Sequence, residues 1–250
     1  MNTISVNTLD GGHSAIEASQ LEELRAAFRG TVLLAGDHGY ESARQIWNGI
    51  FDKKPAIIAR CVGTSDVINA VNFARKNHVL TAVKGGGHNS AGTATCDDGL
   101  MIDLSLMRRV TVDRQNRTAR VDGGALLGDA DHETQLHGLA VSAGIVSHTG
   151  VGGLTLGGGF GWISRKYGLS VDNLISAEVV AADGRLVTAS AKENQDLFFG
   201  IHSRNLVAGP SRPDQDVMLS VPVRGGTTAL RAQETVFEKG RDVHRWSLSW

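Results

Sequence analysis

One short stretch of the chain combines a nucleophilic side chain with unusually bare main chain. Residues 84–92 read Lys-Gly-Gly-Gly-His-Asn-Ser-Ala-Gly and follow directly on an apolar run at residues 79–83. Three consecutive glycines allow positive φ and let main-chain N–H groups approach an anion such as a phosphate. A turn of this kind would present His88 to the ligand. Taken alone, the loop is explained equally well as an ordinary tight turn with an exposed histidine.

A second glycine-rich segment favours the binding interpretation. Seven of the twelve residues from Gly150 to Gly161 are glycine, and most of the others are apolar. This is too much glycine for an amphipathic helix, and the segment is too apolar for a flexible linker. We therefore expect main chain that lies close to a flat or bulky ligand. Neither segment has the Walker A or the Rossmann pattern, which disfavours ATP and NAD in their commonest sites.

Together with Arg165-Lys-Tyr-Gly-Leu-Ser-Val-Asp-Asn-Leu174, these segments resemble the FAD-linked oxidases of the berberine-bridge-enzyme-like family. The resemblance runs from Pro55 to Gly200. It implies an α+β fold, namely a PCMH-type FAD-binding domain with a small parallel α/β subdomain and a second subdomain of mixed sheet and helices. It also implies that FAD is attached covalently, through its 8α-methyl carbon, to the histidine of the first loop, which is His88 here.

The resemblance assigns further residues to the cofactor. The first loop would hold the pyrophosphate, the second segment would lie along the ribityl chain and the isoalloxazine ring, and the strand at residues 175–180 would close over the adenine end. Asp103 is either a carboxylate on the cofactor side or simply the end of a strand. The implied cofactor-binding residues are Gly85, Gly86, Gly87, His88, Asn89, Ser90, Gly92, Asp103, Thr149, Gly150, Gly152, Gly153, Gly158, Tyr167 and Val179. The catalytic residues remain unknown, and no metal site is predicted.

The approach to the second segment bears on how FAD is attached. Many relatives carry a cysteine there that forms a second covalent bond, to flavin C6, whereas this chain has Val146 at that position. The resemblance therefore implies a single link, through His88. Thr149 stands where relatives control oxygen access. We interpret His148 as a loop histidine that faces solvent, with an approach to the flavin ring as the alternative.

Composition narrows the class of protein. With 250 residues, 41% of them hydrophobic and 20% charged, the chain is long enough for one good-sized globular domain. A net charge of −1 gives no reason to expect nucleic acid or an acidic membrane surface as a partner. The N-terminus lacks a secretory pattern and no run reaches the ~18 apolar residues of a membrane span, so we expect a cytoplasmic protein. Cys61 and Cys96 are expected to be buried thiols.

The surrounding sequence predicts the elements that position these residues. Residues 1–50 are typical of a helical lead-in, with a Ser-x-x-Glu capping box that starts a helix at Ser19. Residues 56–83 predict strand, helix and strand, hence a parallel pair that places the first loop at the carboxyl end of a strand. Further elements are expected as strands at residues 31–34, 100–104, 109–113, 118–122 and 175–180, helices at residues 42–47, 125–137 and 194–200, and a hairpin turn at Asp183-Gly184.

The resemblance stops after Gly200. Residues 201–250 contain three of the four prolines and no sustained periodicity, which is typical of a poorly ordered tail. The expected division is a lead-in at 1–50, the FAD-binding domain at 51–200 and an atypical tail at 201–250, with the family's substrate domain absent.

Two functions stay open, together with a flavin-free α/β protein as a third interpretation. The first is an FAD-dependent oxidoreductase that takes a hydride from an alcohol, a sugar or a related secondary metabolite and passes electrons to oxygen or another acceptor. The alternative is a truncated flavin-binding module without turnover.

Overall fold

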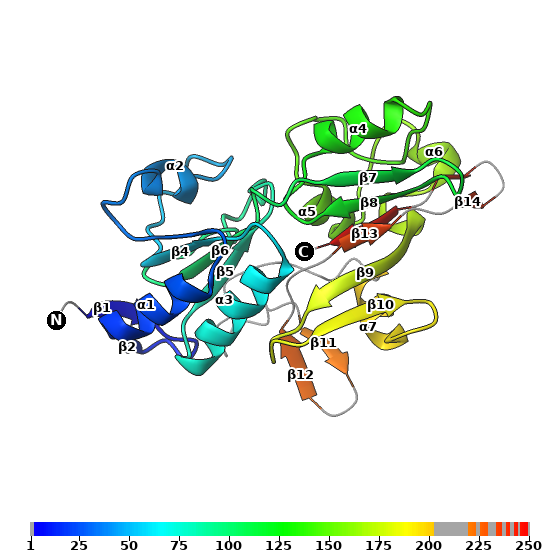
Figure 1. The fold of residues 1–250 in the computed structure, drawn as a ribbon. Coiled ribbons are helices and arrows are strands. Elements are labelled where there is room, and N and C mark those ends of the chain that lie inside the picture. The colour runs from blue at the N-terminus through cyan, green and yellow to red at the C-terminus, as the bar shows by residue number, and fades with distance from the viewer. Residues whose placement is uncertain are drawn as a thin grey trace.

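A computed structural model describes residues 3–202 and, beyond them, the main chain of short strand segments at residues 220–223, 226–229, 234–236, 239–240, 243–244 and 246–249. Two α/β units lie side by side (Figure 1). The predicted α+β class is confirmed. The prediction of a poorly ordered tail concerns mostly residues outside the described ones.

The first unit is built on a four-stranded sheet in the order β3-β4-β6-β5. Its strands are β3 (Thr31–Leu33), β4 (Ile57–Arg60), β5 (Thr81–Lys84) and β6 (Leu100–Asp103). β4 and β5 both run parallel to β6, while β3 is antiparallel to β4 at one edge. Helix α3 (Thr64–Lys76) joins β4 to β5 and buries Val67, Ala70 and Ala74.

The predicted strand, helix and strand at residues 56–83 are confirmed, but the two strands do not pair with each other. β6 lies between them, and each of its four residues is buried. A strand with a continuous apolar run suits the centre of a parallel sheet, because both of its faces are covered there. The first glycine loop follows β5 directly, at the carboxyl end of the parallel strands, as predicted.

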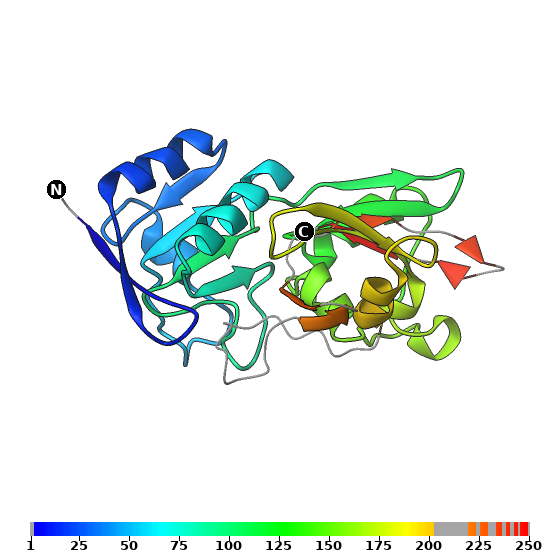
Figure 2. The ribbon, with the colours of Figure 1, turned by 90° about the horizontal axis from the view of Figure 1, so that it is seen from below.

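The first fifty residues pack into the same unit. They form the hairpin of β1 (Ile4–Asn7) and β2 (His13–Ile16), helix α1 (Ala18–Ala27), β3, and helix α2 (Tyr40–Arg44). α1 and α3 lie next to each other over the sheet (Figure 2). Their buried side chains join one hydrophobic core. The division at residue 50 remains a prediction.

The predicted helix start at Ser19 is wrong. The N-cap of α1 is Glu17, whose N–H donates to Oε1 of Gln20 at 2.8 Å. The reciprocal cap therefore uses Gln20 three residues after Glu17, in place of Glu22 after Ser19. The second helix of this region, α2, overlaps the predicted helix at residues 42–47, but it begins at Tyr40 and ends at Arg44.

The second unit contains a mixed sheet in the order β10-β9-β13-β16-β8-β7. β7 (Val110–Asp113) and β8 (Thr118–Asp122) form one hairpin, and β9 (Leu174–Val180) and β10 (Leu186–Ser190) form another. The turn at Asp183-Gly184 is confirmed, with Gly184 at φ +84°. Two strands from the end of the chain, β13 (Glu234–Val236) and β16 (Trp246–Ser249), pair with β8 and β9.

Further short elements complete the described chain. They are the helices α4 (Leu127–Gln135), α5 (Val151–Leu156), α6 (Ser164–Tyr167), η1 (Val171–Asn173) and α7 (Gln195–His202), and the strands β11 (Ser220–Val223), β12 (Gly226–Ala229), β14 (Lys239–Gly240) and β15 (Val243–His244). Across the part of the chain described here, none of the helices has the length and apolar character that crossing a membrane requires.

The second glycine-rich segment differs from expectation, because it begins with helix α5. The helix contains Gly152 and Gly153, which cost stability in a helix. Val151 and Leu156 are buried in the main hydrophobic core. Burial of these apolar side chains offsets the low helix propensity over this single short run. The main chain becomes irregular from Gly157 onwards.

Candidate functional site

The two glycine-rich segments meet between the two sheets, where the loop after β5 approaches the start of α5 (Figure 1). A Cβ atom on Gly86 would lie 2.4 Å from the amide nitrogen of Gly150. Conversely, a Cβ atom on Gly150 would lie 2.6 Å from the amide nitrogen of Gly86. Two main chains approach this closely only if neither residue carries a side chain. The structure thus brings together two segments that are more than sixty residues apart.

The first loop exposes a row of hydrogen-bond donors. Among the residues that the structure describes, the main-chain N–H groups of residues 85–90 donate to no protein acceptor. Asn89 shapes the turn, because its Oδ1 accepts from the N–H of Ala91 at 2.9 Å and its carbonyl oxygen accepts from the N–H of Gly92 at 3.1 Å. Successive unpaired N–H groups next to positive-φ glycine form a concave site suited to an anion. Gly87, at φ +71°, supplies that glycine.

His88 lies between two other rings at the edge of this loop. Its Nε2 is 2.8 Å from Nδ1 of His148, and the two ring centroids are 4.7 Å apart. Trp47 also stacks on His88, with a centroid distance of 5.2 Å and an interplanar angle of 19°. Partial burial lowers the pKa of His88 below its usual value, and the neighbouring His148 lowers it further. The imidazole of His88 is therefore neutral, and hence nucleophilic, at neutral pH.

A segment that precedes β4, residues 43–53, holds the loop from outside. The N–H of Trp47 donates to the carbonyl oxygen of Gly87 at 3.0 Å, and Nδ2 of Asn48 donates to that of Ser90 at 3.0 Å. Nζ of Lys53 donates to the carbonyl oxygen of Gly92 at 3.1 Å. We call residues 43–53 the outer strap. Its donors satisfy carbonyl oxygens of the loop and leave the N–H groups of the loop free.

Charged side chains fix the base of the loop. Arg60, Asp103 and Lys84 stand opposite one another at the ends of β4, β6 and β5. Asp103 is fully buried; its carboxylate is 3.2 Å from Nε of Arg60 and 4.0 Å from Nζ of Lys84, and it accepts hydrogen bonds from Ser105. Burial lowers the pKa of Lys84, and its Nζ also donates to the carbonyl oxygen of Ala43 at 2.5 Å. The strand end directly before Gly85 is therefore tied to both neighbours.

Comparison with known proteins identifies this arrangement. Residues 55–190 match the family described as FAD binding domain. The chain belongs to the FAD-binding domain family of the berberine-bridge-enzyme-like oxidoreductases. The match contains both glycine-rich segments, His88 and His148, and begins after the outer strap.

Relatives of this FAD-binding domain are longer proteins. FAD-linked oxidoreductase pgmH of Aspergillus terreus is 38% identical over 201 residues, which cover 79% of this chain and 40% of that protein. The structure of 6-hydroxy-D-nicotine oxidase from Arthrobacter nicotinovorans aligns with a TM-score of 0.70 and 32% identity, over 84% of this chain and 43% of that one. Glucooligosaccharide oxidase from Acremonium strictum aligns with a TM-score of 0.69 and 36% identity, over 74% and 39%. The chain thus spans about two fifths of the length of these relatives.

The residues present fit FAD. The free N–H groups of residues 85–90 provide donors for a diphosphate. Gly153 is exposed on α5, and a Cβ atom placed on it would meet no atom within 4 Å, so this side of the helix is open to a bulky group. Gly158 is buried at φ +101°, a conformation that favours glycine.

The other predicted cofactor-binding residues lie outside the first loop. Gly152 is buried within α5, and the carbonyl oxygen of Thr149 accepts from the N–H of Leu127 at 2.9 Å. Tyr167 ends α6, and its carbonyl oxygen accepts from Nδ2 of Asn173 at 3.0 Å. The side chain of Val179 is buried in the hydrophobic core, so only its main chain is available to a cofactor.

Sequence reasoning missed two residues beside His88. His148 is exposed, as expected for a loop histidine, but it also contacts His88. Trp47 lies in the lead-in, to which no site residue was assigned. The Trp-Asn pair shortly before the predicted strand, helix and strand at residues 56–83 was the available signal, since tryptophan commonly marks a contact surface. In the structure Trp47 is 62% exposed.

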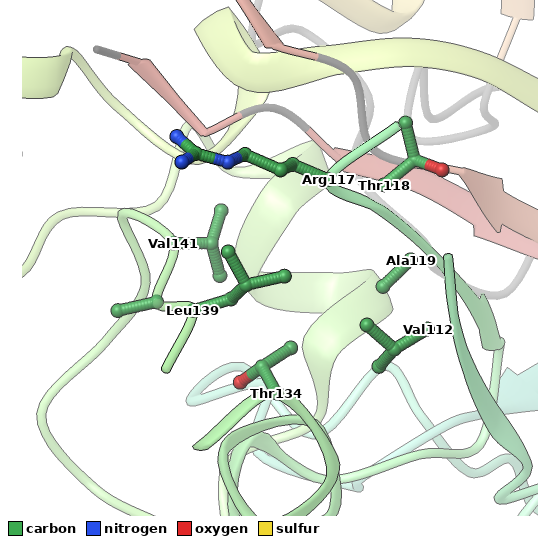
Figure 3. A pocket seen from close by; sticks show the side chains of 8 residues that line it. Val112, Arg117, Thr118, Ala119, Thr134, Leu139 and Val141 are labelled. Carbon is green, nitrogen blue, oxygen red and sulfur yellow. The ribbon is translucent and has the colours of Figure 1, made fainter. Parts of the chain in front are cut away.

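A small pocket in the second unit lies away from these residues (Figure 3). It opens beside β7, β8 and α4, and its wall is mainly apolar. The residues that line it are Val112, Arg117, Thr118, Ala119, Thr134, Leu139, Ala140 and Val141. None of them belongs to either glycine-rich segment. Among the described residues, no group of three or more metal-ligating side chains gathers in one place.

Proposed function

We propose that this chain forms the FAD-binding part of an FAD-linked oxidoreductase and holds FAD covalently through His88. One observation carries the proposal: a neutral, partly exposed histidine stands where two glycine-rich segments touch, on a loop whose N–H groups are unpaired. The substrate would be a small molecule such as an alcohol, a sugar or a related secondary metabolite. Oxygen or another acceptor would receive the electrons.

Different residues of the site would bind different parts of FAD. The N–H groups of residues 85–90 would bind the two phosphates, with Asn89 and Gly92 shaping the turn and Asp103 fixing its base. Gly150, Gly152, Gly153 and Gly158 would admit the ribityl chain and the ring system, with Thr149 at the ring. Tyr167 and the strand with Val179 would lie towards the adenine end. When bound, FAD supplies a two-electron acceptor for a hydride.

A single covalent link is the arrangement that this chain supports. The FAD of the glucooligosaccharide oxidase is described as 6-S-cysteinyl, 8α-N1-histidyl, which means two links in that protein. Here Val146 takes the place of the cysteine and offers no thiol. Both cysteines of the chain, Cys61 and Cys96, are buried, and burial raises the pKa of Cys96 to about 12. We therefore propose His88 alone as the point of attachment.

Turnover is a separate question from FAD binding, because the chain spans about two fifths of its relatives. The alternative is accordingly a module that binds FAD without oxidising a substrate. Purified full-length chain distinguishes the two: yellow protein that bleaches anaerobically with candidate alcohols or sugars is an enzyme, whereas colour without bleaching supports the module.

Attachment is tested by the mass of the denatured chain. Wild-type protein supplied with FAD should carry an FAD-sized increment on the peptide that contains His88. His88→Ala should retain dissociable FAD and lose the increment. His137→Ala, a change at an exposed histidine that follows α4, is the matched control and should keep it. Flavin that stays bonded to denatured His88→Ala protein would exclude His88 as the point of attachment.

A further inference from the structure

The contact between His88 and His148 has a direction, because only one of the two facing nitrogens carries the shared proton. A neutral imidazole has one N–H donor and one nitrogen with a free lone pair. The 2.8 Å separation between Nε2 of His88 and Nδ1 of His148 is that of a hydrogen bond. Which ring donates decides which nitrogen of His88 is free to act as a nucleophile.

The surroundings favour His88 as the donor. If Nε2–H of His88 donates to His148, the remaining proton of His148 lies on its Nε2, which water can reach because His148 is exposed. In the reverse arrangement, the proton of His88 lies on its Nδ1, which makes no hydrogen bond among the described residues. His88 is less exposed than His148, so the first arrangement gives the donor of the less exposed ring a protein acceptor and leaves Nδ1 of His88 with its lone pair.

The contacts with Trp47 and His148 keep the imidazole of His88 in place. Trp47 stacks nearly parallel on it and is itself bound to the loop through the bond from its N–H to the carbonyl oxygen of Gly87. A 180° flip of the imidazole would put Cε1 where Nε2 now lies, and it would break the bond to His148. Such packing holds a reactive group in one rotamer before any ligand arrives.

We propose that His148 is a positioning residue that keeps the proton of His88 on Nε2, so that Nδ1 of His88 is the nitrogen that bonds to the cofactor. This inference rests on the proposed attachment through His88. It adds the residue that selects the reacting nitrogen. When that bond forms, the 8α-methyl group of FAD would lose one hydrogen and His88 would lose its Nε2 proton, for which His148 is the nearest acceptor. The two electrons released would pass through the flavin to oxygen or another acceptor.

The first test needs no cofactor. Full-length chain prepared without FAD and labelled with ¹⁵N-histidine reports by NMR which nitrogen of His88 is protonated, with the signal of His88 identified by its loss in His88→Ala. We expect protonated Nε2 and unprotonated Nδ1 in the wild type. His148→Leu, which removes the acceptor at nearly constant volume, should yield a mixture of both tautomers. Protonation of Nδ1 in the wild type would overturn the proposal.

The second test follows attachment over time by mass spectrometry of denatured protein. Loss of one orienting hydrogen bond should slow attachment about tenfold in His148→Leu. His148→Asn, which retains an acceptor near the same place, should stay within about threefold of the wild type. His137→Leu is the control for loss of an exposed histidine. A wild-type rate in His148→Leu refutes the role of His148, and if that variant does not fold, the wild-type tautomer and the His148→Asn rate decide.

The proposed attachment through His88 and the role of His148 can be refuted separately. Attachment that persists in His88→Ala would remove the proposed function, whatever the tautomer is. Attachment that needs His88 but proceeds equally well without an acceptor at position 148 would leave the proposed function intact and remove only this inference. NMR of the isolated flavin peptide identifies the bonded nitrogen, and a bond at Nε2 of His88 would contradict the proposal directly.

Discussion

The contact between Gly86 and Gly150 predicts an unusually sharp effect for one added methyl group. In Gly86→Ala the new Cβ atom would lie 2.4 Å from the amide nitrogen and 2.5 Å from the Cα atom of Gly150. Ordinary contact begins at 3.4 Å, so the two main chains must separate by about 1 Å. Both are held in place, by the sheet end at Lys84 and by the bond from the N–H of Val151 to the carbonyl oxygen of Ala125.

Overpacking against main chain that cannot move freely costs about 1–3 kcal/mol of unfolding free energy. We expect Gly86→Ala to fall in the upper half of that range and to lose most of its affinity for FAD. Urea unfolding measures the first quantity and flavin fluorescence titration the second. Gly63→Ala is the control, since its Cβ atom would meet nothing within 4 Å and its main chain is extended. Gly63 is the N-cap of α3, so this change should cost at most about 1 kcal/mol of unfolding free energy and leave FAD binding unchanged.

A Gly86→Ala protein that unfolds at the wild-type urea concentration and binds FAD normally would refute the close contact between Gly86 and Gly150. In that case the two segments would have to be further apart in solution, or the loop would have to yield at no cost. Equal losses of unfolding free energy and FAD affinity in Gly86→Ala and Gly63→Ala would show that an added methyl group is harmful at either position. The close contact with Gly150 would then not explain the effect at Gly86.

Three further changes test other parts of the site. Asp103→Asn leaves Arg60 and Lys84 without their buried counter-charge and should lower the unfolding free energy by about 3 kcal/mol, as measured in urea. Gly158→Val places a β-branched residue at φ +101° and should reduce the flavin bound per chain, as measured by absorbance; unchanged stoichiometry would refute the placement of Gly158. Because partial burial lowers the pKa of His88, its ring takes up a proton at a lower pH than a free histidine does, so the midpoint of the fall in attachment rate should lie below the pKa of a free histidine; a midpoint above that pKa contradicts the assignment.

Much of the fold follows from local patterns. Apolar runs at residues 57–60 and 100–103 form strands because their burial is nearly continuous, and the turn at Asp183-Gly184 forms because glycine accepts positive φ there. The two glycine-rich segments were recognisable as partners through the family resemblance, and the structure brings them into contact. Patterns of this kind extend over a few residues and can be recognised in a single sequence.

What the sequence could not show depends on tertiary packing. The apolar run at residues 100–103 suits a central strand, but only the pairing of β6 with both β4 and β5 in the folded chain fixes its place between them. Helix α5 exists because Val151 and Leu156 reach the core, against the propensity of its glycines. His148 meets His88 across sixty residues, only because the main chains at Gly86 and Gly150 touch.

The outer strap has a practical consequence for work on this domain. Four anchors of the first glycine loop, at Ala43, Trp47, Asn48 and Lys53, come before residue 55, where the family match begins. A fragment trimmed to the family boundary would keep each glycine and the histidine, yet its loop would be released on one side. Poor flavin uptake by such a fragment would reflect the missing outer strap. A fragment that begins before Tyr40 would retain the strap.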